Sequence, residues 1–190
     1  MQEVMARGPN FVYAKEYIQK EYGDQLWEQV LNSLPEEAST IWKSTLFTLS
    51  TYPFTAFKTM IDTLSKELGA PEDAEIAKMY EYIADHSLNN LYKMFFKVTS
   101  PSFVIGNYPK LWNRFFDSGK VEVPLVEKSH ARLKFVLPEI FLDWLPAACL
   151  GYSTKAIKMA GGKNLTMKQI SKSSLPNSEW EIIYELRWEK

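Results

Sequence analysis

The sequence predicts an α+β fold, with an amino-terminal helical half followed by a four-stranded antiparallel sheet built as strand, strand, helix, strand, strand. The strongest observation is the last strand, whose polar positions are mostly charged and whose apolar positions hold Trp180, Ile182, Tyr184, Leu186 and Trp188. A period of two puts those side chains on one face, with Ile183 as the exception on the other. Before residue 117, apolar residues recur at helical spacing instead. The sheet needs cover on one face, and the preceding helices can supply it.

Glycine and proline divide the helical half, which we place at residues 11–117. A first helix begins near Phe11, and Gly23 interrupts it just before Asp24, a suitable N-cap for a second helix. A further start is expected at residues 34–37, where a proline precedes two acids.

The middle of the helical half contains two more helices. Residues 44–52 are rich in Ser and Thr, and their state stays open. Pro53 opens a helix that runs to about Leu68, where Gly69 supplies the C-cap. The longest helix begins at residues 71–72, and its apolar stripe extends to its end through Ile76, Tyr80, Ile83, Ser87, Leu91, Met94 and Val98.

Short helices are expected to close this half. Ser100 and Pro101 have the pattern of an N-cap followed by a first turn. Gly106 and Pro109 divide the segment that follows. Residues 117–119 form a turn that leads into the sheet.

The strand–strand–helix–strand–strand segment is placed at residues 119–189. Alternating apolar residues predict paired strands near 121–125 and 131–135, joined by residues 127–129. Pro124 marks an edge position or a bulge, because proline cannot donate a hydrogen bond to a sheet.

The rest of this segment contains the crossover helix and two strands. We expect the helix to run from Pro138 to about Ala160, with a kink at Pro146. A weaker strand at residues 165–171 and a turn at residues 175–178 lead into the last strand.

Length and composition favour one domain over residues 1–190, because 46% of the residues are apolar and no linker or repeat divides the chain. The net charge of −1 gives no general attraction to nucleic acid or to an anionic membrane. The most apolar stretch, residues 135–152, is interrupted by Glu139, Asp143 and two prolines, so it does not suit a membrane span. Residues 1–10 lack the apolar core of a signal peptide. We therefore expect a cytoplasmic protein without a nucleic-acid partner or an integral membrane segment.

The residue types that carry most catalysis are scarce. His86 lies on the flank of the apolar stripe of the long helix, and His130 lies at a hairpin, where a solvated side chain is expected. Cys149 is the only cysteine, so a disulfide within the chain and a cysteine-based zinc site are excluded. Residues 161–164 follow a helix and precede a strand, the wrong context for a phosphate-binding loop. The sequence thus predicts no catalytic residue, no metal site and no enzyme.

Aromatic residues make up 14% of the chain, and most of them are expected to fill the core. Large rings also leave gaps, and ligand pockets are mostly apolar with a few polar groups. Asn90, inside the stripe of the long helix, and Arg114, between aromatic neighbours, can supply such groups. The predicted ligand-binding residues are Phe57, Asn90, Phe95, Trp112, Arg114, Phe115 and Trp144.

The order of segments resembles a known superfamily. The matching stretches are residues 17–23 (YIQKEYG), 52–53 (YP), 100–101 (SP) and 111–119 (LWNRFFDSG). Together with the helical first half and the strand–strand–helix–strand–strand segment at the end, they resemble the superfamily of haem-NO-binding, 4-vinyl-reductase (V4R) and vesicle-tethering (TRAPP-like) domains. Within it, the sequence is most similar to an uncharacterised myxobacterial-type paralogous domain family. The resemblance implies a haem-NO-binding or V4R-like fold.

The resemblance also bears on cofactors. Haem-NO-binding members carry a proximal histidine on the helix before the first strand pair, where this chain has Trp112 and Asn113. Their Tyr, Ser and Arg signature for the haem propionates is incomplete, because Ser129 and Arg132 lack the tyrosine. V4R domains have cysteines near their end, and this chain has none beyond Cys149. We therefore expect no haem and no metal.

Resemblance and aromatic content together predict a non-enzymatic sensory or regulatory domain that binds a small apolar ligand between the helices and the sheet. The alternative is a protein–protein interaction module or a homodimeric scaffold that acts through its surface. An internal cavity would favour the first function, and an exposed apolar patch larger than roughly a few hundred Å² would favour the second.

Overall fold

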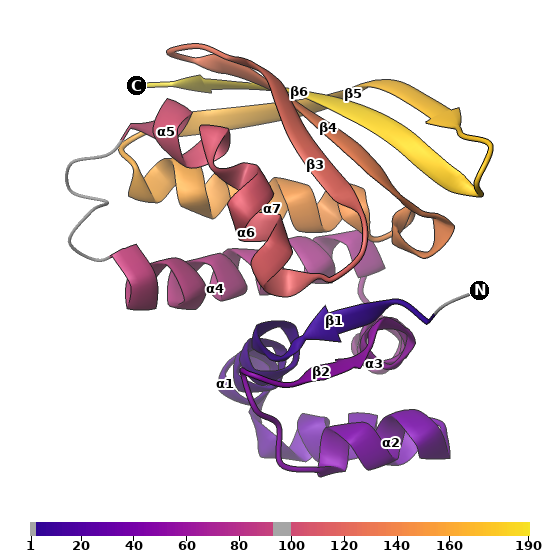
Figure 1. Ribbon diagram of the computed structural model, residues 1–190. Coiled ribbons are helices and arrows are strands. Elements are labelled where there is room, and N and C mark those ends of the chain that lie inside the picture. The colour runs from indigo at the N-terminus through magenta and orange to yellow at the C-terminus, as the bar shows by residue number, and fades with distance from the viewer. Residues whose placement is uncertain (1–2, 93–99) are drawn as a thin grey trace.

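The computed structural model describes residues 3–92 and 100–190, and Figure 1 shows them as a sheet above several layers of helices. The helical elements are α1 (Gly8–Ser33), α2 (Glu36–Lys43), α3 (Phe54–Leu68), α4 (Glu72–Tyr92), α5 (Pro101–Gly106), α6 (Tyr108–Phe115), the short 3-10 helix η1 (Glu139–Phe141) and α7 (Leu145–Met159). The strands are β1 (Met5–Arg7), β2 (Thr51–Pro53), β3 (Lys120–Val126), β4 (His130–Pro138), β5 (Lys163–Ser174) and β6 (Glu179–Glu189).

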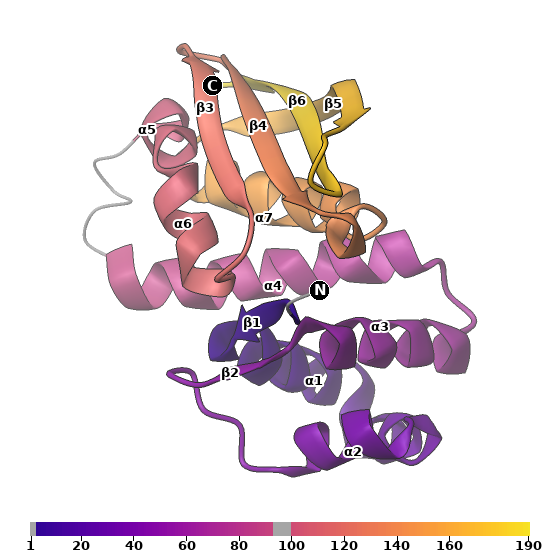
Figure 2. The ribbon, with the colours of Figure 1, turned by 45° about the vertical axis from the view of Figure 1, so that its right-hand side comes forward.

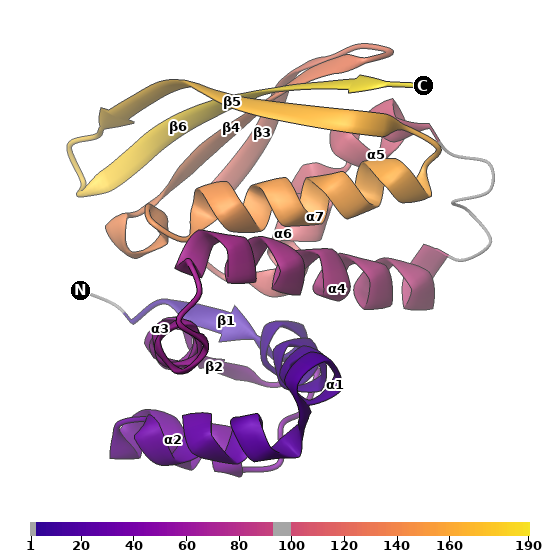
Figure 3. The same cartoon turned by 180° about the vertical axis from the view of Figure 1, so that it is seen from behind.

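The larger sheet has the strand order β3–β4–β6–β5, and all neighbouring strands are antiparallel. Because α7 connects β4 to β5, the predicted α+β arrangement is confirmed. Buried residues of β4 and β6 alternate along the inner face and pair directly, as Phe135 does with Ile182. Figure 3 shows α7 lying beneath this face, between the sheet and α4.

The apolar face of the last strand is largely sheltered. Ile182, Tyr184, Leu186 and Trp188 are at most 4% exposed. Trp180, next to the turn, is half-buried, and the Nζ atom of Lys172 lies 5.2 Å from the centroid of its ring. The lysine therefore covers part of this ring.

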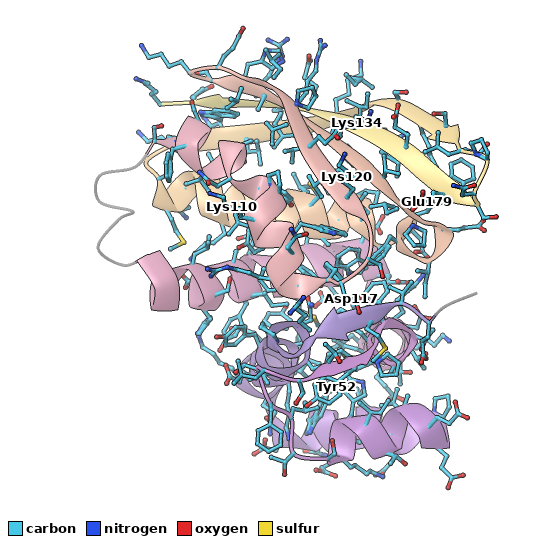
Figure 4. The ribbon with its side chains drawn as sticks, in the orientation of Figure 1. Tyr52, Lys110, Asp117, Lys120, Lys134 and Glu179 are labelled. Atoms are coloured by element: carbon cyan, nitrogen blue, oxygen red, sulfur yellow. The ribbon has the colours of Figure 1, made fainter. Side chains whose placement is uncertain are left out.

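The outer face of the sheet is charged. Nε2 of His130 lies 3.0 Å from Oε1 of Glu185, and Nζ of Lys134 lies 2.8 Å from Oε2 of Glu181. Figure 4 shows Lys120 and Lys134 on the neighbouring strands β3 and β4. His130 was expected to be solvated, but only 17% of its side chain is exposed, because carboxylates of β6 and of the hairpin surround it.

The two edge strands differ in how they limit further pairing. In β3, Pro124 falls within an irregularity of register between Glu122 and Leu125, as the sequence predicted. Strand β5 is longer than the predicted 165–171, and its register is broken in two places. It carries Lys163, Lys168 and Lys172 and no acidic residue.

Helix α1 begins at Gly8, earlier than the predicted start near Phe11, but three other predicted boundary signals are confirmed. Gly23 interrupts α1 with a φ of 83° and a ψ of 167°, a conformation that a helix does not allow. Gly69 ends α3 in the left-handed region, with a φ of 60°. The Oγ atom of Ser100 accepts a hydrogen bond of 3.2 Å from the N–H of Phe103 and so caps α5.

The crossover helix begins later than predicted. Pro138 ends β4, and η1 separates it from α7, which starts at Leu145. Pro146 therefore lies in the first turn of α7 and does not kink it. A first-turn residue needs no backbone N–H for the helix, so proline fits there without breaking a hydrogen bond.

A second, two-stranded sheet in the helical half was not predicted. Strands β1 and β2 pair antiparallel, with Ala6 opposite Tyr52. Strand β2 forms the end of the ambiguous segment 44–52. Strands of three residues are too short for a period of two to be recognised.

Helix α4 joins the two halves. Figure 2 shows it between α7 and the amino-terminal helices α1 and α3. At Gly151 of α7 a β-carbon would overlap the carbonyl group of Ala77, so the two helices touch through their backbones. Helix α4 is described to Tyr92, and the predicted extension to Val98 lies outside the described residues.

One hydrophobic cluster of buried residues extends from β1 to the last strand. It includes α1, α3, α4, α6 and α7 as well as the inner face of the sheet. The assignment of residues 1–190 to a single domain remains a prediction. Within the described ranges, no helix combines the length and the apolarity needed to cross a bilayer.

Candidate functional site

A cavity of about 20 Å³ lies where α4, α6 and α7 meet beneath the sheet. Most of its wall is aromatic, formed by Tyr80, Tyr108, Trp112, Phe115, Phe116, Trp144 and Tyr152. A volume of this size holds about one water molecule. The rings therefore fill most of the space between the helices.

Trp112 has a central place in this packing. Its ring centroid lies 4.6 Å from that of Phe116 and 5.6 Å from that of Phe135 on β4. Its Nε1–H donates a hydrogen bond of 3.0 Å to the carbonyl oxygen of Ser118. The indole is thus held between the helices and the sheet by both packing and a hydrogen bond.

Asn10 connects three elements around the cavity. Its Nδ2 donates to the carbonyl oxygens of Phe115, at 2.8 Å, and Arg7, at 3.3 Å. Its Oδ1 accepts a hydrogen bond of 2.7 Å from the hydroxyl of Tyr80. The side chain is fully buried, so it fixes the start of α1 against the end of α6 and the middle of α4.

Burial keeps three ionisable groups of the cavity wall neutral. Burial raises the pKa of the Tyr80 and Tyr108 hydroxyls well above its usual value. Burial also raises the pKa of the Cys149 thiol to about 11, although the Tyr108 hydroxyl donates to its Sγ atom at 3.5 Å. A phenol or thiol with a raised pKa is a poor general base or nucleophile at neutral pH.

The described residues around the cavity do not fit a haem group. An iron porphyrin is many times larger than the space that the rings leave. Neither histidine lines the cavity: Nδ1 of His86 lies 2.9 Å from the carbonyl oxygen of Tyr82, and His130 lies on the outer face of the sheet. Among the described residues, no group of three or more His, Cys, Asp or Glu side chains is placed to hold a metal ion.

A larger pocket, of about 450 Å³, opens to solvent beside the cavity. It lies between the start of α1, the loop before β2, α4 and α6. Its apolar walls include Pro9, Tyr13, Leu88, Leu111, Phe115 and Tyr152, and its polar residues are Arg7, Thr48, Ser50, Ser87, Asn113 and Arg114. This volume lies within the range of roughly 300–1,000 Å³ that is typical of small-molecule sites.

The cavity and the pocket share a wall made by Leu111, Phe115 and Tyr152. The ring centroids of Phe115 and Tyr152 are 5.5 Å apart, in an edge-to-face contact. A molecule in the pocket would therefore touch the same rings that close the cavity.

The structure brings together some of the predicted ligand-binding residues and separates others. Trp112, Phe115 and Trp144 line the cavity, and Phe115 and Arg114 line the pocket. Phe57 lines neither, because it packs in the amino-terminal core against Phe11, Trp42, Phe54 and Tyr80. Of the remaining two, Phe95 lies outside the described residues. The backbone of Asn90 belongs to α4, but its side chain is also outside them.

Sequence reasoning missed several residues of the site. Arg7, Asn10 and Tyr13 come from the start of the chain, and residues 48–50 come from a segment without periodicity. Only the fold brings them beside α6. Tyr80 was the exception that a local signal could have indicated, because it lies in the apolar stripe of α4 and carries a hydroxyl.

Aromatic helices beneath an antiparallel sheet are the arrangement of a class of sensor domain, the haem-NO-binding domains. The family model for haem-NO-binding domains matches residues 10–105 of the chain. The chain therefore belongs to the haem-NO-binding (H-NOX) family. No protein of curated function matches it in sequence.

Solved H-NOX structures share the fold over nearly the whole chain. A single-substitution mutant of T. Tengcongensis H-NOX is 9% identical, covers 97% of this chain and 98% of its own, and has a TM-score of 0.74. The Fe(II) unliganded H-NOX protein from K. algicida is 11% identical, with 97% of each chain covered and a TM-score of 0.71. An oxygen-binding H-NOX domain related to soluble guanylate cyclases is 8% identical, covers 94% of this chain and 93% of its own, and has a TM-score of 0.70. At these identities the likeness concerns the fold alone.

Proposed function

We propose that this H-NOX domain is a non-enzymatic sensor that binds a small, largely apolar molecule in the pocket between α1, α4 and α6, without a haem. One observation above all supports the proposal. Leu111, Phe115 and Tyr152 line both the pocket and the cavity, so they form the wall between the two spaces. A ligand on one side of this wall can change the packing on the other.

The fold provides a route for such a change. Phe115 is the last residue of α6, which leads directly into β3, and Tyr152 lies on α7, which packs beneath the sheet. Both rings are at most 5% exposed. A displaced ring in a close-packed interior forces its neighbours to move, so binding would shift α6 and the sheet together.

The haem-free part of the proposal is supported by packing and by the position of the histidines. Trp112 and Trp144 occupy the space between the helices, and His86 stacks on Tyr82, with ring centroids 3.9 Å apart. Titration with haemin tests it by absorption spectroscopy. We expect no saturable shift of the Soret band. Stoichiometric haem binding that is lost in His86→Ala would contradict this part.

A substitution that fills the pocket tests the site itself. Asn113 is exposed on α6 and lines the pocket, so Asn113→Trp should place an indole in its mouth. Aromatic fragments screened by ligand-observed NMR should bind the native protein and shift the amide resonances of Leu111, Phe115 and Tyr152. We expect Asn113→Trp to remove this binding.

The matched control is Lys110→Trp. Lys110 lies on the same helix, where Figure 4 labels it. Its side chain is exposed, and it is not among the residues that line the pocket. Lys110→Trp should bind the fragments like the native protein. Binding that survives in Asn113→Trp, or that is lost equally in both variants, contradicts the assignment of the site.

The alternative function is an interaction module or a homodimer, and exposed apolar residues before β2 favour it. Phe47 is 58% exposed and Leu49 is 98% exposed. Light scattering that shows a concentration-dependent dimer, abolished by Leu49→Ser, would support this alternative. The narrower kinship with the myxobacterial-type paralogous family and the cytoplasmic location also remain predictions.

A further inference from the structure

We propose that the pocket between α1, α4 and α6 selects an anionic amphiphile, a molecule with an aromatic or aliphatic body and one carboxylate or sulfonate group. This inference rests on the proposed function and specifies the charge of the ligand. It follows from how charges and apolar surfaces are distributed around the pocket.

Two arginines supply positive charge at the pocket. Arg7 ends β1 and Arg114 lies in the last turn of α6, and both line the pocket. Among the described lining residues there is no Asp or Glu. A guanidinium group can form two parallel hydrogen bonds with a carboxylate, which gives both affinity and orientation.

The start of α1 adds to this positive field. Arg7 precedes the helix, Pro9 lies in its first turn, and both residues line the pocket. The first turn of α1 contains no acidic residue, and no side chain caps it. The partial positive charge of a helix N-terminus is therefore not offset by a carboxylate of its own first turn.

Asn10 holds the charged edge of the pocket, at Arg7, in place relative to the apolar wall, at Phe115. The same Nδ2 atom donates to the carbonyl oxygens of Arg7 and Phe115. The backbone that carries one cation is therefore held at a set distance from a ring of the wall. This is the arrangement that a ligand with a charged end and an apolar body requires.

At the edge of the pocket, an apolar side chain is exposed on a loop that hydrogen bonds hold in place. Leu49 is 98% exposed, while its neighbours are tied down: the N–H of Gly8 donates to the carbonyl oxygen of Ser50 at 2.7 Å, and the N–H of Phe47 donates to the hydroxyl of Tyr52 at 2.8 Å. The body of a bound amphiphile can cover this leucine and remove its surface from water.

A second open pocket has the opposite character. Asp62, Glu72 and Asp143 line it, together with Lys66. An anion would be repelled by these carboxylates. The charge distribution therefore distinguishes the arginine-lined pocket as the place where an anionic ligand binds.

Two fluorescent dyes that differ in one charged group test the proposal. The anionic probe is 8-anilino-1-naphthalenesulfonate, and the neutral probe is N-phenyl-1-naphthylamine, which has the same rings without the sulfonate. In the native protein we expect saturable binding of both dyes, with the anionic dye bound more tightly. Asn113→Trp, which fills the pocket, should abolish the binding of both.

Substitution of the arginines should separate the two dyes. Arg7→Met and Arg114→Met keep an apolar stem and remove the charge, so each should weaken binding of the sulfonate dye by about tenfold and leave the neutral dye unaffected. Arg132→Met, on the outer face of the sheet, is the control and should change neither. Circular dichroism checks that each variant is folded. If Arg114→Met does not fold, the comparison of the two dyes is made with Arg7→Met, which lies at an exposed position.

The outcomes distinguish this inference from the proposed function. The arginine variants can bind both dyes as the native protein does, or they can lose the binding of both dyes equally. Either result would show that the ligand is not selected for its negative charge, while a neutral ligand could still bind in the pocket. If the sulfonate dye binds but Asn113→Trp does not affect it, the dye lies elsewhere and the inference is overturned. If neither dye binds the native protein, the proposed function fails together with the inference.

Discussion

The side chains of Asn10 and Tyr80 meet in the interior of the helical half, where the tyrosine hydroxyl donates to Oδ1 of the asparagine at 2.7 Å. Asn10 is fully buried and Tyr80 is 3% exposed. Burial raises the pKa of Tyr80, so the phenol keeps its proton and remains a donor. This contact joins α1 to α4 beside the cavity, and through Asn10 it extends to the end of α6.

Asn10→Ala should therefore destabilise the fold strongly. The substitution leaves the hydroxyl of Tyr80 and the carbonyl oxygen of Phe115 without their partner in a buried position. We expect a loss of about 3 kcal/mol in the free energy of unfolding, measured by urea denaturation. The exposed Asn113→Ala is the control and should change the free energy by less than about 0.5 kcal/mol. Equal small effects in both variants would show that the contact contributes little.

Gly8→Ala should disturb the rim of the pocket. A β-carbon at Gly8 would overlap the carbonyl group of Phe47, which is backbone and cannot rotate away. We expect the variant to be about 1–3 kcal/mol less stable and the amide resonances of residues 47–50 to shift. Gly106→Ala is the matched control, because a β-carbon there would meet no atom within 4 Å. A Gly8→Ala protein as stable as this control would contradict the close approach.

The stability of the protein should depend on the ionisation of Glu75, which is 2% exposed. Burial opposes ionisation of this carboxyl, but Lys78 and the hydroxyls of Tyr22 and Tyr17 outweigh it and lower its pKa. A carboxyl with a lowered pKa stabilises the folded state above its unfolded pKa, and this stabilisation is lost as the pH falls through the folded pKa.

Glu75→Gln isolates this contribution. At pH 7 we expect the variant to be about 1–3 kcal/mol less stable than the native protein. The difference should shrink as the pH falls below the ordinary pKa of a glutamate and through the lowered pKa of Glu75. Urea denaturation between pH 7 and pH 3 measures it, and Glu28→Gln, at an exposed position of α1, should show no such trend. A difference that is constant with pH would mean that ionisation of Glu75 does not stabilise the fold.

Cys149 should resist thiol reagents in the folded protein. It is 2% exposed, and burial raises its pKa to about 11, so little thiolate is present or accessible at neutral pH. We expect Ellman's reagent to react with it rapidly in denaturant and only at the rate of opening in buffer. An introduced Ser173→Cys, on the exposed strand β5, should react at once. Fast labelling of Cys149 in buffer would show that α7 opens readily.

Much of the fold could be predicted because its signals are local. The alternation of β6, the glycines at positions 23 and 69, and the Ser100 cap each act on their immediate neighbours. The structure confirms them where they were placed. Pro146 was misread because the same residue favours a first turn and breaks an interior turn, and only the true start of α7 decides between them.

The site was harder to predict because its residues are neighbours only in space. Trp112, Phe115 and Arg114 come from one short helix and line the cavity or the pocket, and their role in binding a ligand stays a prediction. Asn10 and Arg7 precede that helix by about a hundred residues, and nothing near them in the sequence indicates a partner. Phe57 was also predicted to bind a ligand, but it lies in the core and lines neither the cavity nor the pocket, as is common for an aromatic residue in a helix.

The two edges of the larger sheet have a consequence for how this protein behaves in a crowded solution. At the β3 edge, Pro124 and the irregular register leave no continuous row of backbone groups with which a neighbouring molecule could form hydrogen bonds. At the β5 edge, the positive charges of the lysines repel a second copy of that strand. Both edges of the sheet therefore oppose strand-by-strand pairing with other molecules.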